Sequence, residues 1–498
     1  MDLTEAQAYQ PSQFASQLSR PTMWAGRHRV NAFAHLVLLA FAPAAALLFR
    51  SIPHQYAVSI TTIGGFLFLP ILSIPLSGLP DYTKELAIST ALALGVVVSQ
   101  KKIPRIAKLY WWDALYCAWI LALPTSYLLN GYPTYNCASS LFIRVVEWGI
   151  PFWIGRSCFQ SRESVRTYLQ VIVIGGLVYV PLALWEVRMS PQLHTDIYGA
   201  FQHSFLQMVR GDSFRPIVFT SHALVTALWF ATALTAAAGL RRMRGNTPKW
   251  MRNAWWIAPV LGISLLLCRS AGALVLGALA YAALAFRLGR LALAMAIAAS
   301  ITYVVSRIFF DATTAAFVAD LLQFLPPERA QSFQYRIDME TQLLERAWGQ
   351  PLIGWCNEGF KSISTTSWDG FEVQAKIVSD SLWIIVFGTS GFLGLIPLYG
   401  TLLASSTRGL LQKMTRGVSE AQVLSTIAAI IMINSVPNGH VGPVAIMTVA
   451  AALGVRANTV PKHLTTSRSP DAAHKLIEPR GPSKNSIQTL DRSNNANS

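Results

Sequence analysis

Charged residues are scarce in this chain. They make up 13% of its 498 residues, whereas hydrophobic residues make up 53%, and an ordinary soluble domain carries about 25% charged residues. Apolar windows of about 20 residues, long enough to cross the hydrocarbon core of a bilayer, recur along the sequence. The composition therefore excludes an ordinary soluble domain and predicts an all-α fold, a polytopic transmembrane helical bundle.

Cysteine is also scarce, and the five residues form no CxxC motif and no ligand spacing: Cys117, Cys137, Cys158, Cys268 and Cys356. Most lie in or near apolar runs, where cysteine behaves as a small hydrophobic residue. The sequence also has no P-loop, no HExxH motif, no nucleophile elbow and no acidic metal motif of nucleotide-sugar transferases. We therefore expect no disulfide framework, no metal site and no other cofactor.

Positive charge is in excess, with a formal net charge of +16. In a soluble protein this excess would indicate a nucleic-acid partner. Here the Lys and Arg residues lie mostly in short loops between apolar runs, as the positive-inside rule requires. The expected partner is therefore membrane lipid, and no nucleic acid is expected.

The apolar runs give candidate spans near residues 31–49, 57–78, 85–99, 109–128, 140–156, 166–186, 216–239, 253–268, 270–286, 290–309, 381–404, 421–437 and 439–455. From residue 100 onward, loops rich in Lys and Arg alternate with the other loops. This alternation places residues 101–108 and 240–252 in the cytoplasm, and 187–215 and 311–379 outside. Basic residues before residue 30 favour a cytoplasmic N-terminus, so one of the first three runs should not cross. We predict about twelve spans, or about thirteen if every run crosses.

The longest polar stretch between apolar runs is residues 311–379. Connections of that length are normally functional or disordered, and this one contains the helical pattern ERAQSFQYRIDMETQLLERAW, so we predict one large helical loop. The first residues lack the order of a cleavable signal peptide, and the C-terminal residues are too polar to fold. We predict a cytoplasmic N-terminal segment at 1–30 and a disordered cytoplasmic tail at 457–498. Between them, the bundle has a first part at 31–310 and a last part at 380–456, which the loop 311–379 separates.

One pair of residues marks the outer end of a predicted span. Arg215 begins the run FRPIVFTSHALVTALWF, and His222 follows seven residues later. If one helix holds both, His222 lies two turns deeper on the same face, ~10 Å below Arg215. An arginine at a helix end often only extends its charged group to the membrane–water interface. An ionisable residue within a span, in contrast, is commonly functional. We interpret the pair as part of a functional site.

Three further places carry charge near apolar runs. Arg336 precedes Glu340 by four residues on the loop helix, a spacing that favours an exposed ion pair. Arg269 lies in CRSAGALVLG, where small residues serve helix packing but do not explain the arginine. Arg144 and Glu147, three residues apart within a span, fit a structural pair as well as a transport or binding role.

Taken in order, these motifs resemble the O-antigen ligase and O-antigen polymerase superfamily. The Arg215–His222 pattern before an Ala- and Leu-rich span is similar to the family's Arg–His motif, and CRSAGAL is similar to its Ser/Arg-Gly-Ala turn. RIDMETQLLERAWGQPLIGWCNEGF resembles an Arg-bearing helix that ends in Pro-Leu-x-Gly-x-Gly, and DSLWIIVFGTSGFLGLIPL resembles the span that follows it. The resemblance covers about residues 180–400.

The resemblance implies a multi-pass glycosyltransferase of the bacterial inner (cytoplasmic) membrane whose active face, with the loop 311–379, is periplasmic. Its donor is a glycan linked to undecaprenyl pyrophosphate, and its acceptor is a growing polysaccharide or the lipid A core. Arg215 and Arg336 would bind the pyrophosphate, because the planar guanidinium fork suits phosphate oxygens. Arg269 and His440 are further substrate-binding candidates. The proton of the acceptor hydroxyl would go to Asp380, His222 or His440.

Two positions depart from the family pattern. Asp380 stands where ligases usually have His, and Cys356 stands at the second Gly of Pro-Leu-x-Gly-x-Gly. We therefore expect a polymerase that joins lipid-linked repeat units of an exopolysaccharide or O-antigen. The alternatives are an O-antigen ligase acting on the lipid A core and, from another class, a lipid-linked sugar flippase or transporter. A transporter should show symmetric halves and mid-membrane charge, and Arg144 and Glu147 alone speak for it.

Overall fold

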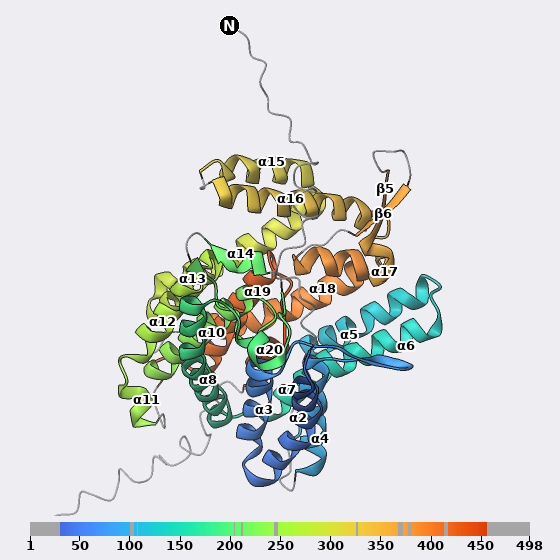
Figure 1. The fold of residues 1–498 in the computed structure, drawn as a ribbon. Coiled ribbons are helices and arrows are strands. Elements are labelled where there is room, and N and C mark those ends of the chain that lie inside the picture. The colour runs from blue at the N-terminus through green and yellow to red at the C-terminus, as the bar shows by residue number, and fades with distance from the viewer. Residues whose placement is uncertain are drawn as a thin grey trace, which may run out of the picture. The chain divides into compact units, whose positions relative to one another are not determined.

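The computed structural model describes residues 30–99, 104–106, 108–203, 205–210, 213–243, 248–324, 327–366, 372–376, 380–412 and 417–455. The predicted tail 457–498 and all but the last residue of the predicted segment 1–30 lie outside these residues. Over the described part the chain is mostly helical, as predicted (Figure 1). Three two-stranded antiparallel hairpins, which the sequence did not indicate, accompany the helices.

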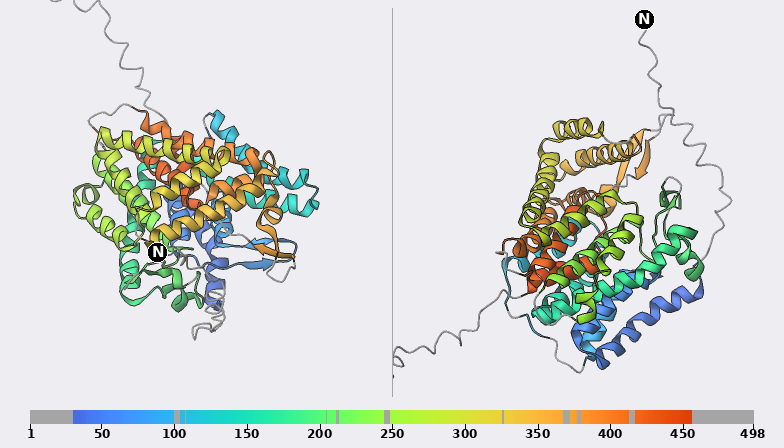
Figure 2. Two further views of the ribbon diagram at one scale, coloured as in Figure 1. Left: turned by 90° about the horizontal axis from the view of Figure 1, so that it is seen from above. Right: turned by 90° about the vertical axis from the view of Figure 1, so that its left-hand side faces the viewer.

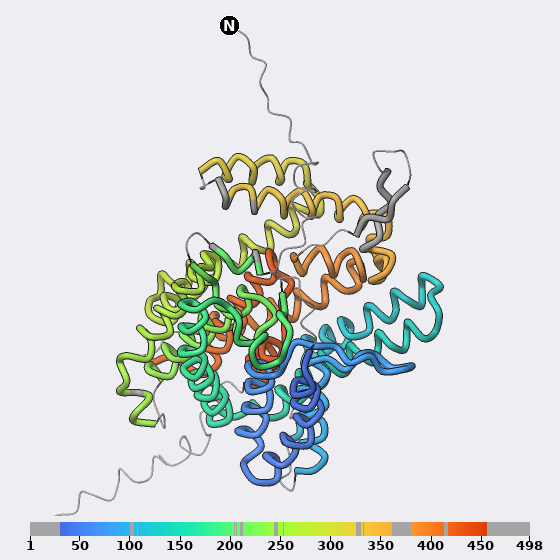
Figure 3. Tube along the Cα trace, viewed as in Figure 1, coloured from blue at the N-terminus to red at the C-terminus, as the bar shows by residue number. Residues whose placement is uncertain are grey.

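The helices of the first part are α2 Ala32–Ser51, α3 His54–Phe68, α4 Lys84–Val98, α5 Trp111–Leu129, α6 Thr134–Ile143, the π-helix η1 Arg144–Gly149, α7 Ile150–Cys158, α8 Arg162–Met189 and α9 Leu193–Tyr198. Those of the middle part are the 3₁₀ helix η2 Phe205–Met208, α10 Ala223–Arg242, α11 Lys249–Asn253, α12 Ile257–Leu267, α13 Ala271–Ala285 and α14 Arg287–Phe309. The last helices are α15 Asp311–Leu322, α16 Pro327–Trp348, α17 Cys356–Lys361, α18 Leu382–Leu410, α19 Glu420–Ser435 and α20 Pro443–Gly454. The strands are β1 Ile74–Leu76, β2 Leu79–Tyr82, β3 Val209–Arg210, β4 Ser213–Phe214, β5 Ser362–Thr366 and β6 Glu372–Lys376. Figure 3 traces the path of the chain through them.

Among the described residues, six helical stretches are long and apolar enough to cross a membrane: Ala32–Ser51, Thr134–Cys158, Arg162–Met189, Ala223–Arg242, Arg287–Phe309 and Leu382–Leu410. Four shorter apolar helices accompany them: Ile257–Leu267, Ala271–Ala285, Glu420–Ser435 and Pro443–Gly454. The structure thus supports a helical membrane protein, and the count of about twelve spans stays a prediction.

One predicted span is shorter than expected. The run 57–78 forms α3 only as far as Phe68, and the chain then turns into the β1–β2 hairpin. Pro70 disfavours a helical conformation for the residue before it, and Leu69 has extended backbone angles. Gly78 takes a positive φ of 75° in the hairpin turn. Hydropathy alone did not separate these residues from the helix.

Two of the family-like motifs meet in the fold. The chain of α18 breaks its helical conformation at Gly391, whose φ is 60°. There the N–H of Phe392 donates to the carbonyl of Pro351 at 2.8 Å, so the turn after α16 packs backbone to backbone on α18. A Cβ on Gly391 would lie 2.3 Å from the backbone of Leu352, so only glycine fits there. Cys356 adopts φ 60°, a left-handed conformation that glycine takes more readily than a residue with a side chain.

Helix direction and contacts define two ends of the bundle. One end of the bundle holds the first residues of α10, α13, α18 and α20 and the last residues of α8, α12, α14 and α19 (Figures 1 and 2). The other terminus of each of these helices lies at the opposite end. The two ends of the 20-residue α10 lie ~30 Å apart. We name the ends by the residues found there: the histidine end has His203, Arg215, His222, Arg336, Asp380 and His440, and the arginine end has Arg156, Arg166, Arg242, Arg290 and Arg408.

Contacts at the arginine end join loops that the sequence predicted to share one side. Arg166 forms an ion pair with Glu420 at 2.6 Å, and Arg290 donates to the carbonyl of Gln412 at 2.7 Å. The backbone N–H of Val418 donates to the carbonyl of Arg242. These contacts agree with the predicted alternation of loops. Which face of which membrane each end occupies stays a prediction.

The predicted loop 311–379 is largely helical. Helices α15 and α16 lie side by side at the edge of the bundle (Figures 1 and 2), and α16 also packs on α18. The loop then adds the β5–β6 hairpin, in which Ser362 pairs with Lys376 and Thr366 with Glu372. Residues 367–371 and 377–379 of the loop are outside the described part.

Candidate functional site

The segment that joins β4 to α10 is buried and non-helical, and one carboxylate holds it. Glu186, fully buried near the end of α8, accepts hydrogen bonds from the N–H groups of Ile217 at 2.8 Å and Val218 at 2.7 Å. Val218 takes a φ of 53°, a conformation that β-branched residues rarely adopt. The expectation that Arg215 and His222 share a helix is therefore wrong, because α10 begins only after His222.

Arg215 lies at this segment's start and is 4% exposed. Its Nε donates to the carbonyl of Cys268 at 3.4 Å, which joins it to the turn between α12 and α13. Arg269, the next residue of that turn, is exposed and has a φ of 50°. The structure thus brings the backbone of Arg269 next to the carbonyl that Arg215 contacts.

His222 is the N-cap of α10. Its Nδ1 accepts a hydrogen bond from the N–H of Leu224 at 3.0 Å, so the neutral ring carries its proton on Nε2, which lies 3.4 Å from Oε1 of Gln207. Burial, then the neighbouring His440, His203, Arg215 and Arg336, lowers the pKa of His222 to about 3. At neutral pH His222 is an uncharged hydrogen-bond donor whose lone pair is already engaged.

Three imidazoles gather at the histidine end. His203 and His222 meet edge to face, with ring centroids 4.5 Å apart, and His440 stacks on His222 at 5.4 Å. His440 comes from the loop between α19 and α20. Burial lowers the pKa of His440, and His203 and Arg336 add to this effect while Asp380 opposes it. Sequence reasoning missed His203, which belongs to no motif.

Arg336 joins α16 to the loop before α20. Its Nη1 donates to the carbonyl of Pro437 at 2.9 Å and to Oδ1 of Asn438 at 3.2 Å, and its Nη2 lies 3.4 Å from Oδ2 of Asp380. The side chains of Arg336 and Asp380 stay 28% and 50% exposed. A Cβ on Gly439 would lie 2.7 Å from the carbonyl oxygen of Asp380, so glycine there lets Asp380 approach the loop that carries His440.

The structure therefore gathers the sequence-predicted residues in one patch. Arg215 and Arg336 come from distant parts of the chain, yet both lie close enough to His222 to lower its pKa. Asp380 contacts Arg336 and is close enough to His440 to oppose the lowering of its pKa by burial. Apart from the imidazoles, the charged groups named here are two guanidinium groups and one carboxylate. Such a patch suits an anion, and its carboxylate is accessible to a bound molecule.

Glu340 does not pair with Arg336 as its spacing suggested. Its carboxylate is buried and accepts from Tyr303 at 2.7 Å, from Trp383 at 3.3 Å and from Ser381, and it lies 3.6 Å from Nε of Arg307. Burial raises the pKa of Glu340, although these hydrogen bonds and Arg307 oppose the shift. Glu340 thus anchors α16 to α14 and to the start of α18, which fixes Arg336 beside Asp380. The buried Arg307, in the last turn of a span, was the signal that sequence reasoning overlooked.

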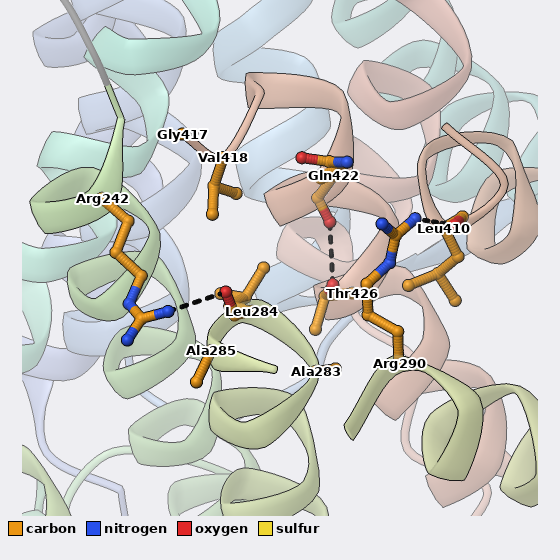
Figure 4. Close-up of a pocket in the computed structure, with 10 residues that line it drawn as sticks. All are labelled: Arg242, Ala283, Leu284, Ala285, Arg290, Leu410, Gly417, Val418, Gln422 and Thr426. Carbon is orange, nitrogen blue, oxygen red and sulfur yellow. Dashed lines mark hydrogen bonds between the residues drawn. The ribbon is translucent and has the colours of Figure 1, made fainter. Parts of the chain in front are cut away.

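A cavity of about 380 Å³ lies at the arginine end (Figure 4). Two of its lining residues, Arg242 and Arg290, donate to carbonyls at helix ends, Arg242 to Leu284 at 3.1 Å and Arg290 to Leu410. Cationic side chains commonly satisfy the last carbonyls of a helix in this way. These arginines therefore serve the fold.

Among the described residues, no group of three His, Cys, Asp or Glu side chains is arranged to hold a metal ion. The expectation that the protein uses no metal and no cofactor stays a prediction.

Comparisons with protein-family models, with curated proteins and with solved structures found no match. The family resemblance thus stays a prediction from the motifs, and the geometry of the histidine end carries the argument for function.

Proposed function

We propose that this protein is an inner-membrane glycosyltransferase that polymerises undecaprenyl-pyrophosphate-linked repeat units of an exopolysaccharide or O-antigen. The histidine end, facing the periplasm, is its active site. The observation that carries the proposal is the convergence of the buried Arg215 with the partly exposed Arg336 and Asp380 at the histidine end.

The two arginines bind the pyrophosphate of the donor. Each guanidinium presents several N–H donors in a plane and stays charged at any relevant pH. Charge builds up on the pyrophosphate as its bond to the sugar breaks, so donors fixed beforehand stabilise the transition state more than the ground state. Arg215 is held by the carbonyl of Cys268 and Arg336 by the loop 437–438, which keeps both donors in place.

Asp380 is the general base. Its carboxylate takes the proton of the acceptor hydroxyl, the hydroxyl oxygen attacks the anomeric carbon, and the electron pair of the broken bond leaves with the pyrophosphate. Asp380 is half exposed, so an acceptor can reach it. His222 is less suited to this role, because its lone pair accepts the N–H of Leu224. His440, beside Asp380, is the second candidate for the base.

Glycans from a strain that lacks the gene, separated by gel electrophoresis, test this function. Loss of long chains with single repeat units retained supports the polymerase. Long chains that are kept but not attached to lipid A would indicate a ligase instead. Carrier-linked units that accumulate in the cytoplasm would indicate a flippase and rule out both transferases.

The side of the membrane is tested separately with single cysteines in a cysteine-free protein. Asp320 on α15 and Leu411 after α18 are both exposed. An impermeant maleimide applied to cells with a permeabilised outer membrane should label Asp320→Cys and leave Leu411→Cys unlabelled. The reverse pattern would refute a periplasmic active face.

A further inference from the structure

A cavity of about 420 Å³ opens between α5, α6, η1, α17 and α18 and has no role in the pyrophosphate site. Its lining mixes aromatic rings with polar groups: Trp119, Tyr127, Tyr135 and Trp148, and Asn136, Ser139, Arg144, Asn357 and Glu358. Tyr127 donates a hydrogen bond to the carboxylate of Glu358, and Tyr135 is 56% exposed. Aromatic faces and hydroxyl, amide and carboxylate groups together suit a sugar, which has apolar C–H faces and many hydroxyls.

The cavity adjoins the histidine end. Leu382 and Ile385 of α18 line it, and Leu382 is two residues from Asp380. A Cβ on Gly439 would lie 3.6 Å from the side chain of Ile385. Ile385 therefore lies next to both the cavity and the loop that carries His440, so the cavity and the histidine end are neighbours along α18.

Arg144 supplies positive charge to a cavity that also holds the carboxylate of Glu358. Its guanidinium lies 3.9 Å from the ring of Trp119 and 5.7 Å from that of Trp148. Across the described part of the chain, it makes no hydrogen bond and no ion pair. The carboxylate that shares its helix, on Glu147, instead accepts a hydrogen bond from Thr83 at 3.2 Å. A guanidinium whose N–H groups lack protein partners in a cavity can bind a carboxylate in a bidentate manner.

The backbone at Arg144 is unusual as well. Arg144–Gly149 forms a π-helix, η1, between two α-helices. Such single-turn insertions are rare and occur frequently at functional sites. Arg144 and Trp148, four residues apart in this insertion, both line the cavity.

We propose that this cavity is a subsite for the acceptor glycan and that Arg144 binds the carboxylate of an acidic sugar within it. The assignment rests on the proposed function for the identity of the acceptor. The binding of a free saccharide, however, can be measured without any polymerisation. The subsite would give the enzyme a preference for chains that contain a uronic acid.

Saturation-transfer NMR on the full-length protein in detergent tests the subsite. The probes are cellobiouronic acid, which ends in glucuronate, its neutral counterpart cellobiose, and inorganic phosphate. The acidic disaccharide should bind ~10-fold or more tightly than the neutral one, since hydrogen bonds to a charged group are the stronger kind. Arg144→Gln should abolish this preference and leave the weak binding of cellobiose unchanged. Displacement of the disaccharide by phosphate at equal concentration would identify a phosphate site and overturn the proposal.

A matched pair of variants on α6 guards against misfolding. Ser139→Trp fills the cavity and should abolish binding of both disaccharides. Leu141→Trp places the same indole side chain on the same helix at a position that is 37% exposed and does not line the cavity, so binding should persist. Equal binding by the two variants would refute the subsite.

The same variants in cells separate this inference from the proposed function. If Arg336→Lys abolishes long chains while Ser139→Trp changes neither chain length nor saccharide binding, the subsite is wrong and the polymerase stands. If saccharide binding depends on Arg144 but loss of the gene leaves polymer unchanged, the polymerase is wrong and the subsite stands.

Discussion

The two ends of the bundle use arginine in different ways. At the arginine end, Arg156 forms a bidentate ion pair with Asp113, in which Nε donates to Oδ1 at 2.7 Å and Nη2 donates to Oδ2 at 2.8 Å. Both side chains are 3% exposed. Arg408 donates to carbonyls at the end of α20, including that of Val455 at 2.9 Å. At the histidine end, Arg336 has its carboxylate partner only at 3.4 Å, and that partner is half exposed. Basic residues that look alike in the sequence thus divide into those that hold helices together and those that remain accessible to a ligand.

Replacing arginine by lysine should separate the two ends most strongly. Arg215→Lys or Arg336→Lys keeps the charge but loses the planar fork, and we expect polymer output to fall by ~10²–10³ at matched membrane abundance. Arg166→Lys, at the arginine end, should leave output near normal, because a lysine can still pair with Glu420. Polymer chain length and amount on gels measure the effect. Equal losses from all three variants would erase the distinction between the ends.

Replacing a carboxylate should reduce stability at the arginine end and activity at the histidine end. Asp113→Asn leaves Arg156 buried with a neutral partner, and we expect a loss of roughly 3–5 kcal/mol in stability with little change in output per folded molecule. Asp380→Asn should abolish polymerisation and leave thermal stability within about 1 kcal/mol, because its ion pair is half exposed. Thermal unfolding in detergent and polymer assays measure the two. Normal chains from Asp380→Asn would move the base to His440.

Glu340→Gln tests whether the buried anchor positions Arg336. The amide oxygen can still accept from Ser381, and the amide nitrogen can donate to the hydroxyl oxygen of Tyr303. The side chain no longer neutralises Arg307, so stability should fall by roughly 3 kcal/mol. If the anchor acts through Arg336, the affinity for a polyprenyl pyrophosphate should fall as well. Unchanged affinity in the folded variant would limit Glu340 to a structural role.

Acidification should destabilise the histidine end through His222. A folded-state pKa of His222 near 3, against about 6.5 unfolded, means that the unfolded chain binds more protons between these values. Stability therefore falls as pH drops from about 6.5 towards 3, by at most ~1.4 kcal/mol per pH unit for this one group. His222→Asn keeps a helix cap and should flatten the slope. An identical slope in the variant would show that other groups cause it.

The helical class and the loops that share one side of the membrane could be predicted from the sequence. Both depend on short stretches of it, namely the hydropathy of each run and the basic residues of each loop. Sequence reasoning also selected Arg215, His222, Arg336 and Asp380, which the structure places at one end of the bundle. It failed where a residue's role depends on a distant partner. Glu186, for example, anchors the segment before α10 through the N–H groups of Ile217 and Val218.

The same limit applies to Glu340 and His203. The carboxylate of Glu340 accepts hydrogen bonds from Tyr303 and Ser381 and pairs with Arg307. All three residues lie more than 30 positions away in the sequence. His203 meets His222 only after the loop has folded back. Such contacts leave no periodic pattern in the sequence, so they became visible only in three dimensions.

The most direct test of the account is binding of undecaprenyl pyrophosphate to the purified protein, measured by calorimetry in detergent beside undecaprenyl monophosphate. We predict that the pyrophosphate binds more tightly than the monophosphate, and that Arg215→Lys and Arg336→Lys each weaken it by ~10-fold or more. Arg166→Lys should bind as the unaltered protein does. Equal affinity for the pyrophosphate in all four proteins would contradict the assignment of the histidine end as the donor site.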